Sequence, residues 1–283
     1  MTTNIGLIFD FDDTLAPDST TQLLEEYGID PEQFWFTEFQ PRVREGYDPT
    51  VAYLSLLLEK VGNDQPLGEL TIEDLEDFGA DLTETLYPGL PGLFDDIDSI
   101  ADEYEDIVIN YYILSEGLEP IIQGTDIADR CEAVYASRLD TDSEDILQSI
   151  QRPISFTDKT RYLYEINKGI TPEEARDNPY AVNTQMDPED RPIPFENMIY
   201  IGDGITDIPC FSLVKDRGGR VFGVIDSDEG SAKQRAIRDI GSPRRAGNLN
   251  RPMYGESGRL GSLLRLTIEG ICTDRTIDEL EAL

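Results

Sequence analysis

Five short apolar runs constrain the fold of this chain more than any other feature of its sequence. Each run has the length of a β-strand, and unbroken apolar stretches of that length are typical of strands buried on both faces of a parallel sheet. The runs are Ile5–Phe11, Ile107–Leu114, Ala133–Ser137, Met198–Ile201 and Val221–Ile225. Helical patterns separate the later runs, at Leu118–Gly124, Arg161–Asn167 and Cys210–Val214. This alternation predicts an α/β fold with a doubly wound parallel sheet.

Nearly a hundred residues separate the first run from the second, which is far too long for a simple crossover connection. The interval has helical patterns at Thr20–Tyr27, Pro31–Phe39, Val51–Lys60 and Ile72–Thr85. We therefore predict an inserted α-helical cap over residues 18–88, with residues 1–17 and 89–283 forming the catalytic core. Residues Thr171–Phe195 are expected to form a long surface loop, and Gly241–Tyr254 shows no readable pattern.

The residue types present limit the chemistry that the chain can perform. It contains no histidine, which excludes Ser-His-Asp hydrolases, His-ligated zinc enzymes and histidine general bases. Its three cysteines are widely spaced and form no CxxC pair, which argues against a disulfide scaffold and a zinc site. Catalysis would therefore depend on carboxylates, lysine and hydroxyl groups, with or without a hard metal ion.

The net charge of −35 is the most unusual property of the composition. Residues 1–150 contain 36 acidic and 5 basic side chains, against 22 and 18 in residues 151–283. Such a surface would repel a nucleic-acid backbone, so no nucleic-acid partner is expected. We interpret the charge as an adaptation to multimolar salt, where self-repulsion is screened.

Neither a signal peptide nor a membrane span is expected from the sequence. The N-terminal residues MTTNIGLIFDFDDT lack a basic region, and no apolar run approaches the length needed to cross a bilayer. We therefore expect a soluble, cytoplasmic protein with no membrane partner. The oligomeric state cannot be read from the sequence.

Polar residues follow the predicted strands at the edge where ligands of α/β sheets gather. The first strand ends in Asp10-Phe11-Asp12-Asp13-Thr14, the second in Ser115, and the fourth in Gly202-Asp203-Gly204-Ile205-Thr206-Asp207. A further helix opens at Asp158-Lys159-Thr160. Several carboxylates, a lysine and a hydroxyl would therefore converge, and carboxylate oxygens are ligands that suit Mg²⁺.

This order of motifs resembles the haloacid dehalogenase superfamily. The resemblance rests on DFDDT at residues 10–14, Ser115 within YYILSEG, Lys159 within DKTRYLYEINKG, and GDGITD at residues 202–207. It covers residues 1–17 and about 89–226, and the nearest likeness is to phosphoserine-phosphatase-like members with a helical cap. The resemblance implies a Mg²⁺-dependent phosphohydrolase that cleaves a small phosphorylated metabolite through an aspartyl-phosphate.

The resemblance also implies a role for each motif residue. Asp10 would be the nucleophile, and Asp12 the general acid and base. Ser115 and Lys159 would bind the phosphoryl oxygens. Mg²⁺ would take Asp10, the backbone carbonyl of Asp12, and Asp203, while Asp207 would orient Lys159 or a metal-bound water. A phosphotransferase or mutase of the same superfamily, and a silent module that binds phosphorylated ligands, remain alternatives.

The cap contains two groups of residues whose role the sequence leaves open. Arg42 and Arg44 could anchor an anionic part of the substrate, and the aromatic residues Phe34, Trp35, Phe36 and Phe39 could line a pocket. We favour the simpler interpretation, in which the aromatic rings form the core of the cap and the arginines pair with Glu38 and Glu45.

Overall fold

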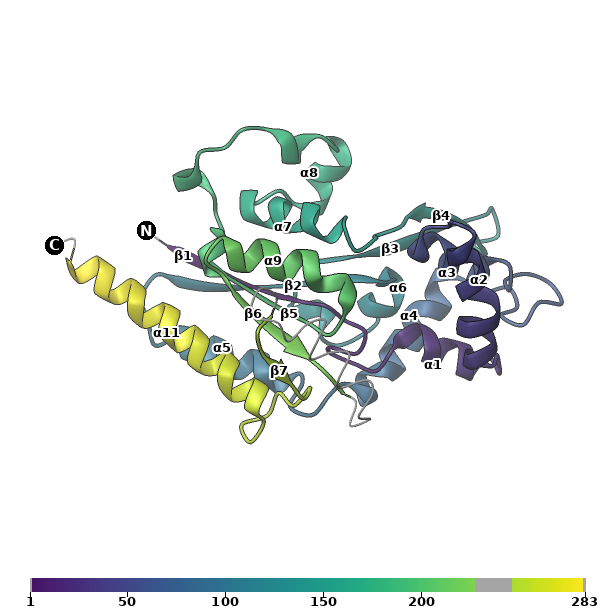
Figure 1. Ribbon diagram of the computed structural model, residues 1–283, viewed down its shortest axis with the longest axis horizontal. Helices are drawn as coiled ribbons and strands as arrows, with labels where there is room; N and C mark the ends of the chain where they lie inside the picture. The colour runs from purple at the N-terminus through teal and green to yellow at the C-terminus, as the bar shows by residue number, and fades with distance from the viewer. Residues whose placement is uncertain (1, 227–245, 282–283) are drawn as a thin grey trace.

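The computed structural model describes residues 2–226 and 246–281, and one seven-stranded sheet forms its centre (Figure 1). The strand order is β4-β3-β2-β1-β5-β6-β7, and all neighbouring strands are parallel except β3 and β4. The strands are β1 (Thr3–Phe9), β2 (Ile107–Leu118), β3 (Ala133–Thr141), β4 (Leu147–Arg152), β5 (Met198–Gly202), β6 (Arg220–Val224) and β7 (Leu249–Asn250). Because β1 is central, the residues that follow it lie in the middle of the carboxyl edge.

Helices cover both faces of the sheet. The α-helices of the described residues, including those of the cap, are α1 (Ser19–Glu26), α2 (Gln40–Arg44), α3 (Pro49–Leu58), α4 (Ile72–Leu82), α5 (Gly92–Ala101), α6 (Glu119–Gln123), α7 (Lys159–Lys168), α8 (Pro172–Asp177), α9 (Ile208–Asp216) and α11 (Arg259–Glu281). Leu7 and Phe9 of β1 belong to one core with residues of α5 and α11, whereas Ile8 belongs to a second core with residues of α7 and α9. The period of two in a strand explains this division. The predicted doubly wound α/β fold is confirmed.

The long segment between β1 and β2 is helical, as expected. It contains α1 to α4 and a π-helix at Gln33–Phe39. These helices form a third hydrophobic core, which also takes Leu118, Ile121, Leu139 and Leu147 from outside the segment. The cap therefore rests on α6 and on the far ends of β3 and β4. Its treatment as a separate domain of residues 18–88 stays a prediction.

The structure contains several elements that the sequence patterns did not predict, including helices α5 and α11. Strand β4 pairs antiparallel with β3, and it lacks the apolar run of the other strands because Leu147 and Ile150 are its only apolar residues. The expected loop Thr171–Phe195 contains helix α8, which begins with a capping box between Thr171 and Glu174. Within Gly241–Tyr254, strand β7 joins the edge of the sheet, while residues 241–245 lie outside the described part of the chain.

No helix in residues 2–226 and 246–281 is both long and apolar enough to span a membrane.

Candidate active site

The predicted catalytic residues come together at the carboxyl edge of the sheet. Asp10 and Asp12 follow β1, Ser115 lies near the end of β2, Lys159 is the first residue of α7, and Asp203 follows β5. All five line one cavity of about 300 Å³. The parallel strands explain this convergence, because their carboxyl ends meet at one edge. Residues that are up to 193 positions apart in the sequence therefore share a site.

Lys159 is fully buried and connects two of the aspartates. Its Nζ lies 3.1 Å from Asp10 Oδ2 and 2.8 Å from Asp207 Oδ1. Burial alone would lower the pKa of the Lys159 amine, but the charges of Asp10 and Asp207 hold that pKa well above its usual value. Lys159 is therefore a permanent positive charge beside Asp10.

Asp207 is fully buried, and both of its carboxylate oxygens accept hydrogen bonds. The hydroxyl of Tyr200 donates to Oδ1 at 2.7 Å, and the backbone N–H of Gly204 donates to Oδ2 at 3.0 Å. A Cβ added to Gly202 would lie 2.3 Å from Oδ2, so this glycine leaves the room that the carboxylate fills. These contacts suit a residue that holds Lys159 in place.

The residues present suit a hard metal ion. Carboxylate oxygens of Asp10, Asp203 and Asp207 lie within 4.8 Å of one another. Burial, followed by the charge of neighbouring aspartates, raises the pKa values of Asp10 and Asp203 well above the ordinary range. A divalent cation would offset this like-charge repulsion, and oxygen donors are the ligands that Mg²⁺ prefers. The donor set therefore fits the predicted metal.

Asp12 has the surroundings of an acid that can release and regain a proton. Its Oδ1 accepts a hydrogen bond from the backbone N–H of Ser19 at 2.7 Å. Burial, reinforced by the charge of Asp18, raises the pKa of Asp12 to about 7. On its other side lies Gly117, where an added Cβ would be 2.5 Å from Asp12 Oδ2 and 3.2 Å from Ser115 Oγ.

The sequence patterns gave several residues of the site no role. Gly117 and Gly202 lie inside the motifs YYILSEG and GDGITD, but their importance, like that of Tyr200, comes from the groups that they contact. Glu116 also lines the cavity, and the hydroxyls of Tyr53 and Ser137 donate to its backbone carbonyl at 2.5 and 2.9 Å. Burial raises the pKa of the Glu116 side chain to about 7. The only available signal was its position directly after Ser115.

The cap closes one side of the cavity with aromatic rings. Trp35, Phe39 and Tyr53 line it, and the ring centroids of Trp35 and Phe39 are 5.2 Å apart. The expectation that the aromatic cluster is only cap core is therefore wrong for Trp35 and Phe39. It holds for Phe34, which is fully buried, whereas Phe36 is exposed.

The two cap arginines do not line the cavity, and their predicted partners were wrong. Arg42 pairs with Glu59 at 2.5 Å, and Arg44 donates to Gln40 at 3.2 Å. The expected partners, Glu38 and Glu45, were chosen for their closeness in the sequence, but the fold brings the side chain of Glu59 to Arg42 from α3's end.

Comparisons with known proteins agree with this arrangement. No family model matches the chain. An uncharacterized protein of Borreliella burgdorferi is 33% identical over 236 residues, which cover 75% of this chain and 79% of that protein. A HAD family hydrolase of Salmonella enterica serovar Typhi superposes with a TM-score of 0.54 at 18% identity, over 83% of this chain and 66% of the other. The chain therefore shares its fold with a haloacid dehalogenase family hydrolase.

A second solved structure extends the similarity over almost the whole chain. An aspartyl-phosphate intermediate analogue of phosphoserine phosphatase superposes with a TM-score of 0.52 at 17% identity, over 94% of this chain and 99% of the other. At such low identities these likenesses establish the fold alone. The fold agrees with the superfamily and the phosphoserine-phosphatase-like form that the four motifs predict. The roles of individual residues stay predictions.

Proposed function

We propose that this protein is a haloacid dehalogenase superfamily phosphohydrolase that cleaves a small phosphorylated metabolite through a phosphorylated Asp10. One observation carries the proposal: Asp10 stands at the end of the central strand, 3.1 Å from the buried Lys159, in a cavity shared with Asp12, Ser115 and Asp203. A nucleophile, a proton carrier and a fixed positive charge are the groups that a phosphoryl transfer requires.

In the first step a carboxylate oxygen of Asp10 forms a bond to phosphorus, and the bond from phosphorus to the leaving oxygen breaks. Asp12 gives its proton to that oxygen, so the product leaves as an alcohol. Lys159 offsets the charge on the phosphoryl oxygens as they pass through the transition state, and the Ser115 hydroxyl donates to them. Asp10 then carries the phosphoryl group.

In the second step Asp12, now ionised, removes a proton from a water molecule that attacks the phosphorus. The bond between phosphorus and the Asp10 oxygen breaks, and inorganic phosphate forms. Both carboxylates return to their starting states. Division of one slow hydrolysis into two steps is the general advantage of a covalent intermediate.

Asp10, Asp203 and the backbone carbonyl of Asp12 would hold Mg²⁺. When bound, the cation would supply positive charge that offsets repulsion between the phosphoryl group and the carboxylates. Asp207 is better suited to orient Lys159, since protein donors already occupy both of its oxygens.

Phosphate release from a panel of phosphorylated metabolites and p-nitrophenyl phosphate tests the proposal. We expect release that requires Mg²⁺, proceeds in multimolar KCl, and is lost in Asp10→Asn. If a folded protein moves phosphate to a second alcohol and none to water, it is a phosphotransferase or mutase. No turnover of any kind would favour a silent binding module.

A further inference from the structure

A second cavity, of about 360 Å³, lies between helices α7 and α8 and the strands β3 and β4. It shares no lining residue with the candidate active site. Its volume is within the range of small-molecule sites. Four arginines line it: Arg138, Arg152, Arg161 and Arg176.

This concentration of arginine is unusual for the molecule. The chain has 23 basic residues against 58 acidic ones, yet four of the basic residues line this one cavity. Glu165 is the only acidic residue among them. The local charge therefore has the opposite sign to the charge of the protein, which a merely solvated surface of this composition would not produce.

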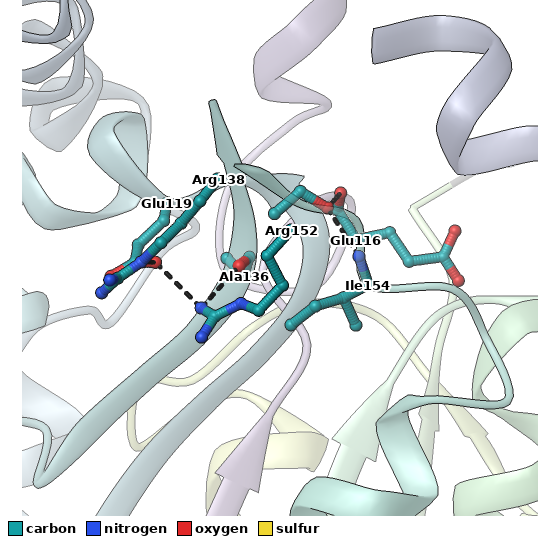
Figure 2. A network of polar contacts seen from close by, with 7 residues as sticks. Glu116, Glu119, Ala136, Arg138, Arg152 and Ile154 are labelled. Carbon is teal, nitrogen blue, oxygen red and sulfur yellow. Dashed lines mark hydrogen bonds and ion pairs between the residues drawn. The ribbon is translucent and has the colours of Figure 1, made fainter. Parts of the chain in front are cut away.

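The strand side of the cavity holds two guanidinium groups on one carboxylate. Figure 2 shows Arg138 and Arg152 directed at Glu119, a buried residue at the start of α6. Arg152 Nη2 lies 3.1 Å from Glu119 Oε2 and also donates to the carbonyl of Ala136 at 3.1 Å. Because the two guanidinium groups share one carboxylate, Arg138, Arg152 and Glu119 together carry one excess positive charge. Within residues 2–226 and 246–281, Arg152 Nε is buried and has no hydrogen-bond partner.

The helical side adds two more arginines. Arg161 Nε donates to Glu165 Oε1 at 2.8 Å, while the other oxygen of this buried carboxylate has no partner in the described part of the chain. The guanidinium groups of Arg161 and Arg152 lie 5.3 and 6.0 Å from the ring centroid of Tyr162, which orients both. Arg176 is exposed and has no ion pair with any described residue.

We propose that this cavity binds a small anion that carries a phosphate group. Oriented guanidinium groups donate paired hydrogen bonds to phosphate oxygens, and an anion would offset the excess positive charge. The buried Arg152 Nε is a donor without a partner in the described part of the chain, and a phosphate oxygen could accept its hydrogen bond. The site is separate from the catalytic cavity, and its existence does not depend on the proposed hydrolysis.

Calorimetric titration with ribose 5-phosphate tests this site. The titration uses the Asp10→Asn protein in EDTA, at the lowest KCl concentration that keeps it folded. Turnover is then absent, and the carboxylates of the catalytic cavity repel the probe. We expect one binding event that ribose does not produce. Arg176→Gln is the first variant, because this exposed side chain has no partner whose loss would disturb folding.

Loss of one charge-assisted contact should weaken binding about tenfold in Arg176→Gln and in Arg161→Gln. The matched control is Arg217→Gln, an exposed arginine that stacks on Phe195 outside the cavity and should leave the affinity unchanged. The absence of binding to the folded protein would overturn the proposal. Equal affinity in Arg176→Gln, Arg161→Gln and Arg217→Gln would overturn it as well. Loss of binding in Ser115→Ala would also overturn it, because Ser115 lines the catalytic cavity.

Discussion

In the proposed mechanism Asp12 exchanges a proton during turnover, and its position beside Ser19 and Asp18 suits that task. An ordinary aspartate is ionised at neutral pH, but burial raises the pKa of this carboxyl to about 7, so it can still donate a proton there. For alkyl phosphates, kcat/KM should therefore fall as pH rises above about 7, by about tenfold per pH unit. Steady-state pH profiles measure this fall.

The matched control for that profile is p-nitrophenyl phosphate, whose leaving group departs without needing a proton. Its kcat/KM should show no fall over the same pH range. Asp12→Asn should remove the fall for alkyl phosphates and lower their kcat/KM at all pH values. The same fall with both kinds of substrate would mean that Asp12 is not the acid.

Gly117 is the second residue whose surroundings give a clear expectation. In Gly117→Ala the new Cβ would meet Asp12 Oδ2 at 2.5 Å, so the carboxylate must move. A displacement on that scale should lower kcat/KM about a hundredfold while the protein remains folded. Kinetics together with circular dichroism measure both effects.

The control for Gly117→Ala is Gly270→Ala in α11, where an added Cβ meets nothing within 4 Å. That change should leave kcat/KM as it is and stabilise the fold by about 0.5–1 kcal/mol. Unchanged activity in a folded Gly117→Ala protein would contradict the tight packing around Asp12.

Sequence patterns predicted the site residues that lie in motifs at strand ends or helix starts. They did not predict the residues whose importance comes from a tertiary contact. Asp10 and Asp203 follow strands, Ser115 lies near the end of β2 and Lys159 begins a helix, so the topology brings them together. Tyr200 is a generic strand residue, and its hydroxyl reaches Asp207 only because β5 ends beside α9. Its role depends on distances that no spacing in the sequence encodes.

At the scale of elements, residues of the cap line the cavity, so we expect the cap to influence which leaving group fits there. Trp35, Phe39 and Tyr53 provide an apolar wall, and Asp18 and Glu116 add carboxylates beyond those of the proposed chemistry. Lys159 is the only basic residue that lines the described cavity. A leaving group that carries a carboxylate should therefore be disfavoured, because the cavity offers it no second cation.

Two probes of similar size test this preference. Phosphoethanolamine carries an ammonium group and phosphoglycolate a carboxylate, and kcat/KM should be about tenfold or more higher for the first. Glu116→Gln keeps the shape of the side chain and should bring the two values closer. Equal values in the unchanged protein would contradict the preference.

The sequence predicts those strands that are buried on both faces, because such strands are unbroken apolar runs. Strands β1, β2 and β5 are apolar because both of their faces are covered, and their positions agree with the predicted runs. Strand β4 has only two apolar residues, Leu147 and Ile150, and most of its side chains are not buried, so its sequence resembles a polar loop. The contact of the cap with α6, where an added Cβ on Gly79 would meet the Ile121 carbonyl at 2.0 Å, depends on a tertiary approach that no local pattern reveals.

At the scale of the whole molecule, the net charge of −35 should make stability depend on salt. Mutual repulsion of surface carboxylates destabilises the compact state, and screening reduces it as the Debye length falls to about 3 Å at 1 M salt. The midpoint of thermal unfolding should therefore rise with KCl from about 0.1 M to above 1 M. Calorimetry at several KCl concentrations measures this rise.

Sucrose provides the control for the salt effect, because it stabilises compact states without screening charge. It should not replace KCl in keeping the protein folded. A midpoint that is the same in low and high KCl would contradict the interpretation of the charge as an adaptation to salt.

The most direct test of the central claim is to detect the phosphoryl group on Asp10. The enzyme would be mixed with excess substrate and Mg²⁺, quenched in acid within the first turnover, and digested for mass spectrometry. The account predicts a phosphoryl group on the peptide that contains Asp10, and none in the Asp10→Asn protein. Rapid release of phosphate with no phosphorylated peptide at any quench time would contradict it.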